Sequence, residues 1–298
     1  MKYIEYKDRT SGALRKEIVP GEKWLQWLYH NPVGKIALSA VVKRKCLSEW
    51  YGGRMDLPSS TERIPEFVQN LNINMGEATR PMDDYTSFND FFIRELKPGA
   101  RPIDEDPNSV VSPADGKVLA FDGITGLDSF FVKGQEFNLD SFLRDPNLTR
   151  QFEGGTLLII RLAPVDYHRF HFPADGIVSE SRIIDGDYYS VSPYAVKDRL
   201  SVYWENKRAR SVLRTKHAGA MVLCEVGATM VGSIVQTHKA NTEVEKGQEK
   251  GWFKFGGSTV IMLLEKGKVR IDKDLLDNTR QGYETSIRMG ERVGLVNG

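Results

Sequence analysis

The segment Thr259-Val260-Ile261-Met262-Leu263-Leu264 is an unbroken and largely apolar run, and Phe255-Gly256-Gly257-Ser258 precedes it. A run this short and this apolar is typical of a strand buried on both faces, not of an exposed helix. The glycines allow the close backbone approach that a bulge at the start of such a strand requires. They also leave the Gly257–Ser258 peptide bond unhindered, beside a hydroxyl group that is able to attack it. Spacing alone leaves both interpretations open.

The residues around this run predict a β-rich core. From Val110 to about Asp272 the chain consists of short β-type runs separated by turns. Pro-Ala-Asp-Gly occurs at 113–116 and again at 173–176, and Lys-Gly-Gln-Glu occurs at 133–136 and 246–249. Two β-halves related by a weak internal repeat, as in a barrel or sandwich of short strands, would give this recurrence. Coincidence is the alternative, because Asp-Gly and Lys-Gly are common turn dipeptides.

The N-terminal third has a different pattern. Residues 20–50 are expected to form two helices, the first apolar and aromatic around Trp24 and Trp27, the second ending in Lys43-Arg44-Lys45. Aromatic residues beside a basic cluster suit a helix in a membrane interface, but also a helical pair packed on its own domain. A Pro/Gly-rich connection at 95–102 closes this part.

We therefore predict an α+β protein, with N-terminal helices followed by a mainly antiparallel β core. Residues 1–105 form a helical, membrane-associating region and residues 106–298 a β-rich catalytic domain. The polar tail after Asp274 is expected to be a surface appendage.

Composition excludes several classes of protein. The chain has 298 residues, 40% hydrophobic and 27% charged, with a net charge of +1, so nothing global predicts a nucleic-acid partner. The two cysteines, Cys46 and Cys224, have no metal or redox spacing, and Cys224 is expected inside a buried strand. Neither a signal-peptide core nor a run of ~18 apolar residues is present, which predicts a protein kept on the cytoplasmic side.

Two histidines lie in a constrained polar stretch bracketed by Pro164 and Pro173. His168 and His171 are two of only five histidines, and their spacing in this setting suggests acid–base chemistry. A metal site is not favoured, because no further Cys or His lies at ligand spacing.

Ser258, His171 and Asp115 are candidates for a nucleophile, its base and the residue that orients the base. Asp175, the counterpart of Asp115 in the repeat, is assigned to a turn. No Gly-x-Ser-x-Gly elbow surrounds Ser258, because position 260 is Val, so an α/β-hydrolase is not expected.

Four segments of the chain carry a family resemblance: residues 91–102 (Phe-Phe-Ile-Arg-Glu-Leu-Lys-Pro-Gly-Ala-Arg-Pro), 112–116 (Ser-Pro-Ala-Asp-Gly), 167–173 (Tyr-His-Arg-Phe-His-Phe-Pro) and 255–259 (Phe-Gly-Gly-Ser-Thr). Together they make the chain resemble phosphatidylserine decarboxylases, the pyruvoyl-dependent enzymes that make phosphatidylethanolamine. One departure is Gly256, where many bacterial members of that family have Leu.

The resemblance implies autocatalytic cleavage between Gly257 and Ser258, giving a β chain of residues 1–257 and an α chain of residues 258–298. Ser258 would become a covalent pyruvoyl group, which forms a Schiff base with the substrate amine and accepts the electrons released with carbon dioxide. On this reading His171, held by Asp115, activates Ser258 for cleavage, and His168 protonates the carbanion of the substrate. No metal is expected.

The implied partners are phosphatidylserine, an anionic membrane surface and the two chains of the cut protein; a homodimer is compatible with the sequence. The resemblance favours the interfacial interpretation of residues 20–50, and thus a peripheral protein on the cytoplasmic face of the cell membrane. Two other functions remain open: a lipoyl-like carrier or membrane-binding module, and a serine hydrolase that uses Ser258 in an intact chain.

Overall fold

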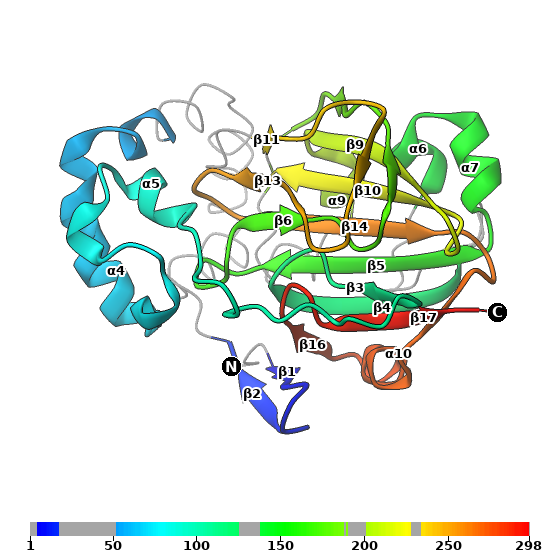
Figure 1. Cartoon of the computed structure of the whole chain (residues 1–298), viewed down its shortest axis with the longest axis horizontal. Helices are drawn as coiled ribbons and strands as arrows, with labels where there is room; N and C mark the ends of the chain where they lie inside the picture. The colour runs from blue at the N-terminus through cyan, green and yellow to red at the C-terminus, as the bar shows by residue number, and fades with distance from the viewer. Residues whose placement is uncertain are drawn as a thin grey trace, which may run out of the picture.

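A large, mainly antiparallel sheet forms the centre of the molecule (Figure 1). The computed structural model describes residues 5–17, 52–124, 138–187, 189, 201–227 and 234–297. Five neighbouring strands make up the middle of this sheet, and all four of their pairings are antiparallel. In spatial order these strands are β9 (Arg208–Thr215), β10 (Ala220–Gly227), β14 (Ser258–Leu264), β5 (Gly155–Leu162) and β4 (Gly116–Ile124). The apolar run after Gly257 is therefore the central strand, as predicted.

Shorter strands extend the sheet on both sides. Beyond β9 lie β7 (Gly176–Val178) and β12 (Thr242–Val244), with β8 (Arg182–Ile184) also paired to β9; beyond β4 lie β16 (Glu284–Ile287), β1 (Glu5–Lys7) and β2 (Leu14–Lys16). Two three-stranded sheets complete the β structure: β11 (Ile234–Gln236), β13 (Glu249–Phe253) and β6 (Arg169–His171), then β15 (Val269–Ile271), β17 (Arg292–Val296) and β3 (Ser109–Val111). The α+β class is confirmed, and over the described ranges the main sheet is open, not a closed barrel.

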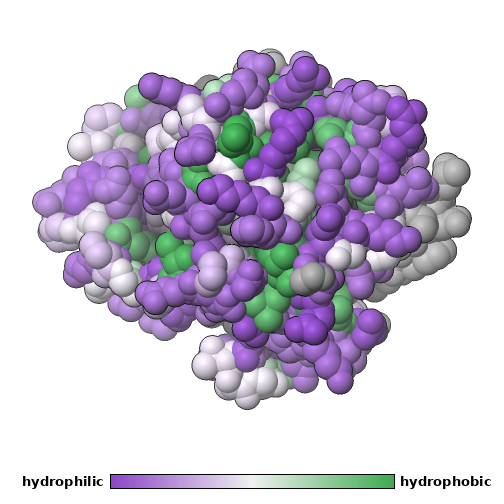
Figure 2. Space-filling model, turned by 45° about the vertical axis from the view of Figure 1, so that its right-hand side comes forward, coloured by the Kyte–Doolittle hydropathy of each residue, from purple (hydrophilic) through white to green (hydrophobic). Residues whose placement is uncertain are grey.

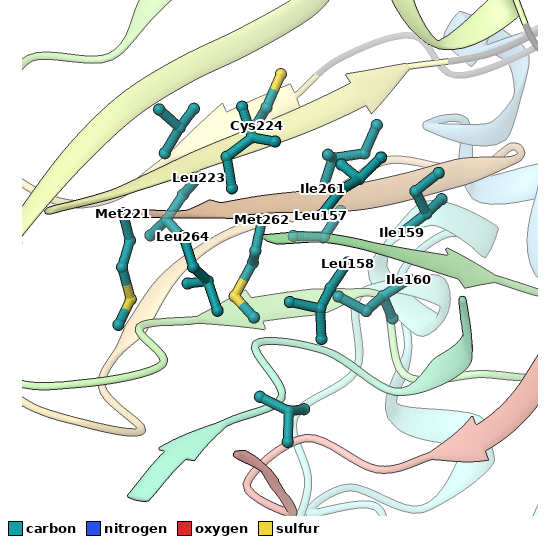
Figure 3. Close-up of a cluster of buried hydrophobic side chains, with 14 of the residues drawn as sticks. Leu157, Leu158, Ile159, Ile160, Met221, Leu223, Cys224, Ile261, Met262 and Leu264 are labelled. Carbon is teal, nitrogen blue, oxygen red and sulfur yellow. The ribbon is translucent and has the colours of Figure 1, made fainter. Parts of the chain in front are cut away.

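The main hydrophobic core lies around the central strands. Every residue of β5, β10 and β14 is buried, which explains their continuous apolar sequences. Figure 3 shows side chains from these three strands packed together, among them Leu158, Ile261 and Cys224. Burying one such side chain contributes roughly 1.5–3 kcal/mol, so β14 is firmly held in the sheet.

Helices cover the ends of the sheet. The pair α6 (Leu139–Leu143) and α7 (Pro146–Phe152) lies at one end, α10 (Lys273–Arg280) lies against β4 and β16, and α9 (Val202–Glu205) precedes β9. At the other end, on the left in Figure 1, are α4 (Ile64–Leu71), α5 (Phe88–Phe92) and the short 3-10 helices Pro58–Arg63, Met75–Glu77 and Met82–Asp84. The face in Figure 2 is mostly hydrophilic, with small apolar areas between polar side chains.

A second core belongs to the N-terminal helices. Eight buried residues form it, and Phe255 and Val165 of the β-rich part pack against it. The eight are Met55, Ile64, Leu71, Ile73, Tyr85, Phe88, Phe91 and Phe92. Because Phe255 lies two residues before Gly257, this helical part holds the chain next to the proposed cleavage bond.

Two expectations about the ends of the chain need correction. The residues after Asp274 are not a surface appendage, because β16 and β17 are integral strands with Thr285, Ile287 and Val293 buried. Their polar residues alternate with these inward-facing ones, which hid the strands in a sequence read for continuous apolar runs. The N-terminal region also contributes β1 and β2 to the main sheet, so it is not purely helical.

The helical pair expected at 20–50 lies outside the described residues, as do Lys43, Arg44 and Lys45. Among the described helices, none has the length and apolarity needed to cross a membrane.

Candidate active site

The proposed cleavage bond lies where β14 begins. Ser258 is the first residue of the strand, pairs with Leu162 on one side and Gly227 on the other, and is fully buried. Gly256 has φ = 144°, a backbone conformation that a residue with a side chain rarely adopts. The turn before Ser258 therefore favours glycine at 256.

His168 is the side chain that contacts the Ser258 hydroxyl. Its Nδ1 atom lies 3.2 Å from Oγ of Ser258, and its Nε2 atom lies 3.1 Å from the carbonyl oxygen of Ala163. A carbonyl oxygen only accepts, so Nε2 must carry the hydrogen and Nδ1 of the neutral ring is left to accept from the serine. The fold thus selects the tautomer that a base for Ser258 needs.

The surroundings of His168 keep its ring uncharged. The side chain is completely buried, and burial together with the nearby positive charge of Arg94 lowers the pKa of His168 to about 3. The ring of Phe92 is stacked on the imidazole, with 3.9 Å between the ring centroids. His168 is therefore a neutral acceptor at physiological pH, and its rotation is restricted by an aromatic neighbour.

An ion pair holds the loop that carries His168. Nζ of Lys117 lies 2.9 and 3.1 Å from the carboxylate oxygens of Asp166, and this carboxylate accepts a hydrogen bond from the backbone N–H of Ala163 at 2.6 Å. The carbonyl of Ala163 in turn contacts His168. Because both charged side chains are largely buried, this pair is screened little by water and fixes the loop firmly.

His171 occupies a different position. It ends β6, donates its backbone N–H to the carbonyl of Pro113 at 2.8 Å, and its ring lies beside Tyr167 with 5.7 Å between centroids. Burial and the charge of Arg169 lower its pKa to about 4, and its Nδ1 atom has no hydrogen-bond partner among the residues that the structure describes.

The structure therefore gives the Ser258 contact to His168 and not to His171. Residues three apart in an extended chain point to opposite faces, so only one of the two rings reaches the serine. In the part of the chain described, neither His171 nor Asp115 has a hydrogen bond to Ser258. The separate roles assigned to the two histidines stay predictions.

Asp115 joins its own turn to two other segments, 14 and 174 residues away in the sequence. Its carboxylate accepts hydrogen bonds from the guanidinium of Arg101 at 2.7–2.9 Å and from the backbone N–H of Met289 at 2.8 Å. Arg101 also pairs with Glu77. Asp175, its counterpart in the repeat, accepts the backbone N–H of Lys246 at 2.7 Å, which fits the turn role assigned to it. The Asp of the repeated tetrapeptide thus makes buried contacts between segments at position 115 and belongs to an exposed turn at position 175.

The N-terminal helices clamp the residues just before the bond. The Asn89 side chain accepts the backbone N–H of Phe255 at 2.8 Å and donates to Asp56 at 2.9 Å, while Lys254 pairs with Asp56 at 3.0 Å. The Phe255 ring lies edge-on to Phe92, with 5.0 Å between centroids.

Sequence reasoning did not assign roles to the residues around the serine and His168. Phe92 and Arg94 belong to the segment 91–102 and Asn89 lies just before it, and the density of aromatic and polar residues there was the available signal. Lys117 gave no such signal, because its partner Asp166 is 49 residues away.

Comparison with known proteins shows which family the chain is similar to. A family model described as phosphatidylserine decarboxylase matches residues 88–295. The phosphatidylserine decarboxylase proenzyme of Fusobacterium nucleatum subsp. nucleatum is 54% identical over 291 residues, which cover 98% of this chain and 97% of the relative. The proenzymes of Clostridium novyi and Clostridium botulinum are 45% and 43% identical, covering 93% and 98% of this chain and 94% and 98% of the relatives.

The chain belongs to the phosphatidylserine decarboxylase family. The resemblance inferred from the sequence is confirmed, and all four motif segments lie inside the matched range 88–295. The chain is accordingly an enzyme of the decarboxylase class, and the relatives' names mark this family as one of zymogens that serve phospholipid synthesis. Among the described side chains, no group of three His, Cys, Asp or Glu residues is placed to hold a metal ion.

Proposed function

We propose that this phosphatidylserine decarboxylase is a proenzyme that cuts itself between Gly257 and Ser258 and then uses a pyruvoyl group derived from Ser258. The observation that carries the proposal is the contact between the neutral His168 ring and the buried Ser258 hydroxyl. A serine hydroxyl is a poor nucleophile until a base takes its proton, and His168 is the base within reach.

The cleavage step follows from these atoms. Nδ1 of His168 takes the hydroxyl proton as Oγ of Ser258 attacks the carbonyl carbon of Gly257. The peptide C–N bond breaks, the proton passes to the released nitrogen, and an ester joins the two residues. Loss of the Ser258 α-proton then breaks the Cβ–O bond and frees the Gly257 carboxylate. Water hydrolyses the remaining dehydroalanine with loss of ammonia, leaving a pyruvoyl group at the start of the α chain.

The low pKa of His168 makes it a weak base, which suits a reaction that each molecule performs once. We propose that His171 and Asp115 support maturation without contacting Ser258 themselves. The backbone N–H of His171 donates to the carbonyl of Pro113, which lies two residues before Asp115. The buried Asp115–Arg101 pair would hold that segment in place.

The residues around Ser258 fit the pyruvoyl group. The group would cap the central strand of the sheet, in a fully buried position beside the His168 ring. When present, it supplies a ketone that takes up the substrate amine and accepts the electrons released with carbon dioxide. His168 remains next to this position after cleavage, and its Nδ1 atom could take the proton that the substrate ammonium must release when its amine reacts. We propose that His168 then passes this proton to the substrate carbon after carbon dioxide has left. The stacked Phe92 ring limits the access of water there.

The substrate is proposed to be phosphatidylserine in an anionic membrane, reached from the cytoplasmic face by a peripheral enzyme. The aromatic and basic residues within 20–50 support this proposal. Binding to anionic liposomes should weaken as salt rises, and replacing Lys43, Arg44 and Lys45 by Ala should weaken it at low salt. Salt-independent binding would argue for a purely structural role of this segment.

One experiment tests the central proposal. The purified chain should give two polypeptides on a denaturing gel, with intact masses that match residues 1–257 and a blocked 258–298 fragment. The smaller polypeptide should react with a hydrazine or with borohydride in the presence of an amine. Ser258→Ala should give a single chain without carbonyl or decarboxylase activity.

The same contact supports a second candidate, a serine hydrolase that uses the His168–Ser258 pair in an intact chain. That function predicts one polypeptide and covalent labelling of Ser258 by a fluorophosphonate. The gel and mass measurement therefore separate the two candidates.

A further inference from the structure

A cavity lies behind the loop that carries His168. Its volume is about 330 Å3, and its wall includes Arg94, Val165, Asp166 and Arg288. The loop therefore has two sides: Val165 and Asp166 line the cavity, whereas His168, two residues further on, contacts Ser258.

The cavity wall contains several buried cations that already have anionic partners. Arg101 pairs with Asp115 and Glu77, and Lys117 pairs with Asp166. Such pairs are neutralised internally and have little charge left for a ligand.

Arg94 differs from these cations. It is only 5% exposed, and among the described residues its one hydrogen bond is a long contact of 3.4 Å from Nη2 to the carbonyl of Val165. Nη1 has no hydrogen-bond partner, and within the described residues no carboxylate lies within ion-pair distance of this guanidinium. Burial lowers the pKa of Arg94, since a charged group without a counter-ion is costly inside a protein. A buried guanidinium in a cavity wall, with one nitrogen that has no hydrogen-bond partner among the described residues, is suited to bind an anionic ligand.

We infer that Arg94 binds the phosphodiester group of the phospholipid substrate in this cavity. The inference rests on the proposed function and extends it by assigning the residue that holds the headgroup. A planar guanidinium matches two oxygens of a phosphate in a forked geometry, which buried Nη1 and Nη2 atoms can present together. Arg288, an exposed residue, also lines this cavity, where its charge acts on Asp8 and Glu77.

The substrate offers a second anion, its carboxylate, but this is the poorer partner for Arg94. The carboxylate loses its charge as carbon dioxide forms, so a guanidinium bound to it would stabilise the ground state more than the transition state. The phosphodiester keeps its charge throughout the reaction. Binding it lowers the concentration of substrate required without opposing the chemical step.

Binding can be measured without any turnover. The probe is dihexanoylphosphatidylmethanol, a soluble phosphodiester lipid with neither amine nor carboxylate, titrated calorimetrically into the matured two-chain protein. Arg94→Gln should raise its Kd about 10- to 100-fold, the scale of a lost charge-assisted hydrogen bond, and Arg94→Lys should raise it less. Arg280→Gln, which removes an exposed arginine from α10, is the matched control and should leave Kd unchanged.

Turnover measurements separate the two anions of the substrate. For dihexanoylphosphatidylserine, Arg94→Gln should raise KM by a similar factor with a smaller change in kcat. For O-hexyl-L-serine, which keeps the amine and carboxylate but lacks phosphate, wild type and Arg94→Gln should be equally slow. Equal losses on both substrates would mean that Arg94 holds the carboxylate or supports the fold, and would overturn the inference.

Two further outcomes would also overturn it. If inorganic phosphate binds more tightly than the lipid probe, and if this binding is lost in Arg94→Gln, the cavity is a site for a free anion. Wild-type protein that binds dihexanoylglycerol as tightly as the probe would show that no phosphate is recognised, and this result needs no variant to fold. If the wild type binds the probe through Arg94 but releases no carbon dioxide from phosphatidylserine, the proposed function fails while the binding site stands.

Discussion

Nδ1 of His168 lies 3.2 Å from the hydroxyl oxygen of Ser258, although 90 residues separate the two along the chain. The contact forms because Ser258 starts the central strand β14, while the carbonyl of Ala163 and the ring of Phe92 hold the imidazole in place. Under the proposed cleavage mechanism, this contact makes His168 the residue on which maturation should depend most directly.

His168→Ala should therefore leave most of the protein as one uncut chain, with cleavage slowed about 100-fold or more, the usual scale for a lost general base. His171→Ala should slow cleavage less, because His171 has no contact with the serine. Gel, intact mass and decarboxylase activity should be measured on the same preparations. Normal cleavage in His168→Ala, together with an uncut His171→Ala chain, would instead assign the base to His171, as the sequence alone suggested.

Both histidines should make the folded protein sensitive to acid. Their pKa values in the folded state are about 3 and about 4, below the ordinary value of 6.5, because burial disfavours the charged ring. Below pH 6.5 the unfolded chain binds more protons at these sites, so stability is complete above that pH and falls as pH decreases towards the folded-state values. Between pH 6.5 and 5 each histidine should reduce the free energy of unfolding by about 2 kcal/mol.

This is best measured by urea denaturation of the Ser258→Ala chain at several pH values, which avoids cleavage during the experiment. Adding His171→Gln should remove the share of the pH dependence that comes from His171 and leave the share from His168 and from His238, whose pKa is also lowered by burial. His217→Gln, at an exposed histidine, is the control and should leave the pH dependence as it is. An unchanged slope in the His171 variant would mean that His171 is not held neutral by the fold.

Asp115 and Asp175 offer a matched pair for testing what the repeated tetrapeptide does. Asp115→Asn replaces a buried carboxylate, which binds Arg101 and the backbone of Met289, by a neutral amide. The change should destabilise the protein by about 3 kcal/mol and slow maturation. Asp175→Asn changes only an exposed turn and should mature normally. Thermal unfolding and the rate of chain cleavage check both. An Asp115→Asn protein of normal stability that stays uncut would favour a direct role of Asp115 in the chemistry.

The central strand and the α+β class were predictable because buried strands produce continuous apolar sequences, as β5, β10 and β14 do. The C-terminal strands β16 and β17 were missed, since they are short and each mixes polar with apolar residues. Thr285 and Ile287 face inward only because β4 lies beside them, and this neighbour is about 170 positions earlier in the chain.

The site was partly predictable for a similar reason. The two histidines, the serine and the glycines are recognisable because their chemistry is unusual in such short stretches. Which histidine contacts Ser258 depends on how the chain at the start of β6 is oriented relative to the start of β14. A spacing of three residues does not determine that orientation. Arg94 was not recognisable as a binding residue. What marks it is that it is buried without a carboxylate partner among the described residues, and a sequence does not show which residues pair in the fold.

The two chains of the cut protein should remain a single folded particle. β14 would belong to the α chain, yet it lies between β10 and β5 of the β chain and is paired with each along its whole length. β16 and β17 of the α chain likewise pair with β4 and β3 of the β chain. Cutting the bond before Ser258 leaves all of these hydrogen bonds in place, so separating the chains would require unfolding the core.

The matured protein should therefore elute from a sizing column with the uncut Ser258→Ala chain, and native mass spectrometry should find one α and one β chain per protomer. The chains should separate only at the denaturant concentration at which the circular dichroism of the sheet is lost. Ile261→Ala, in the middle of β14, should lower that midpoint because a buried Ile-to-Ala change costs about 2–5 kcal/mol. Ile183→Ala, at a side chain that is 53% exposed, should leave it nearly unchanged. An α chain that separates before the sheet unfolds would show that β14 is not held as its pairing implies.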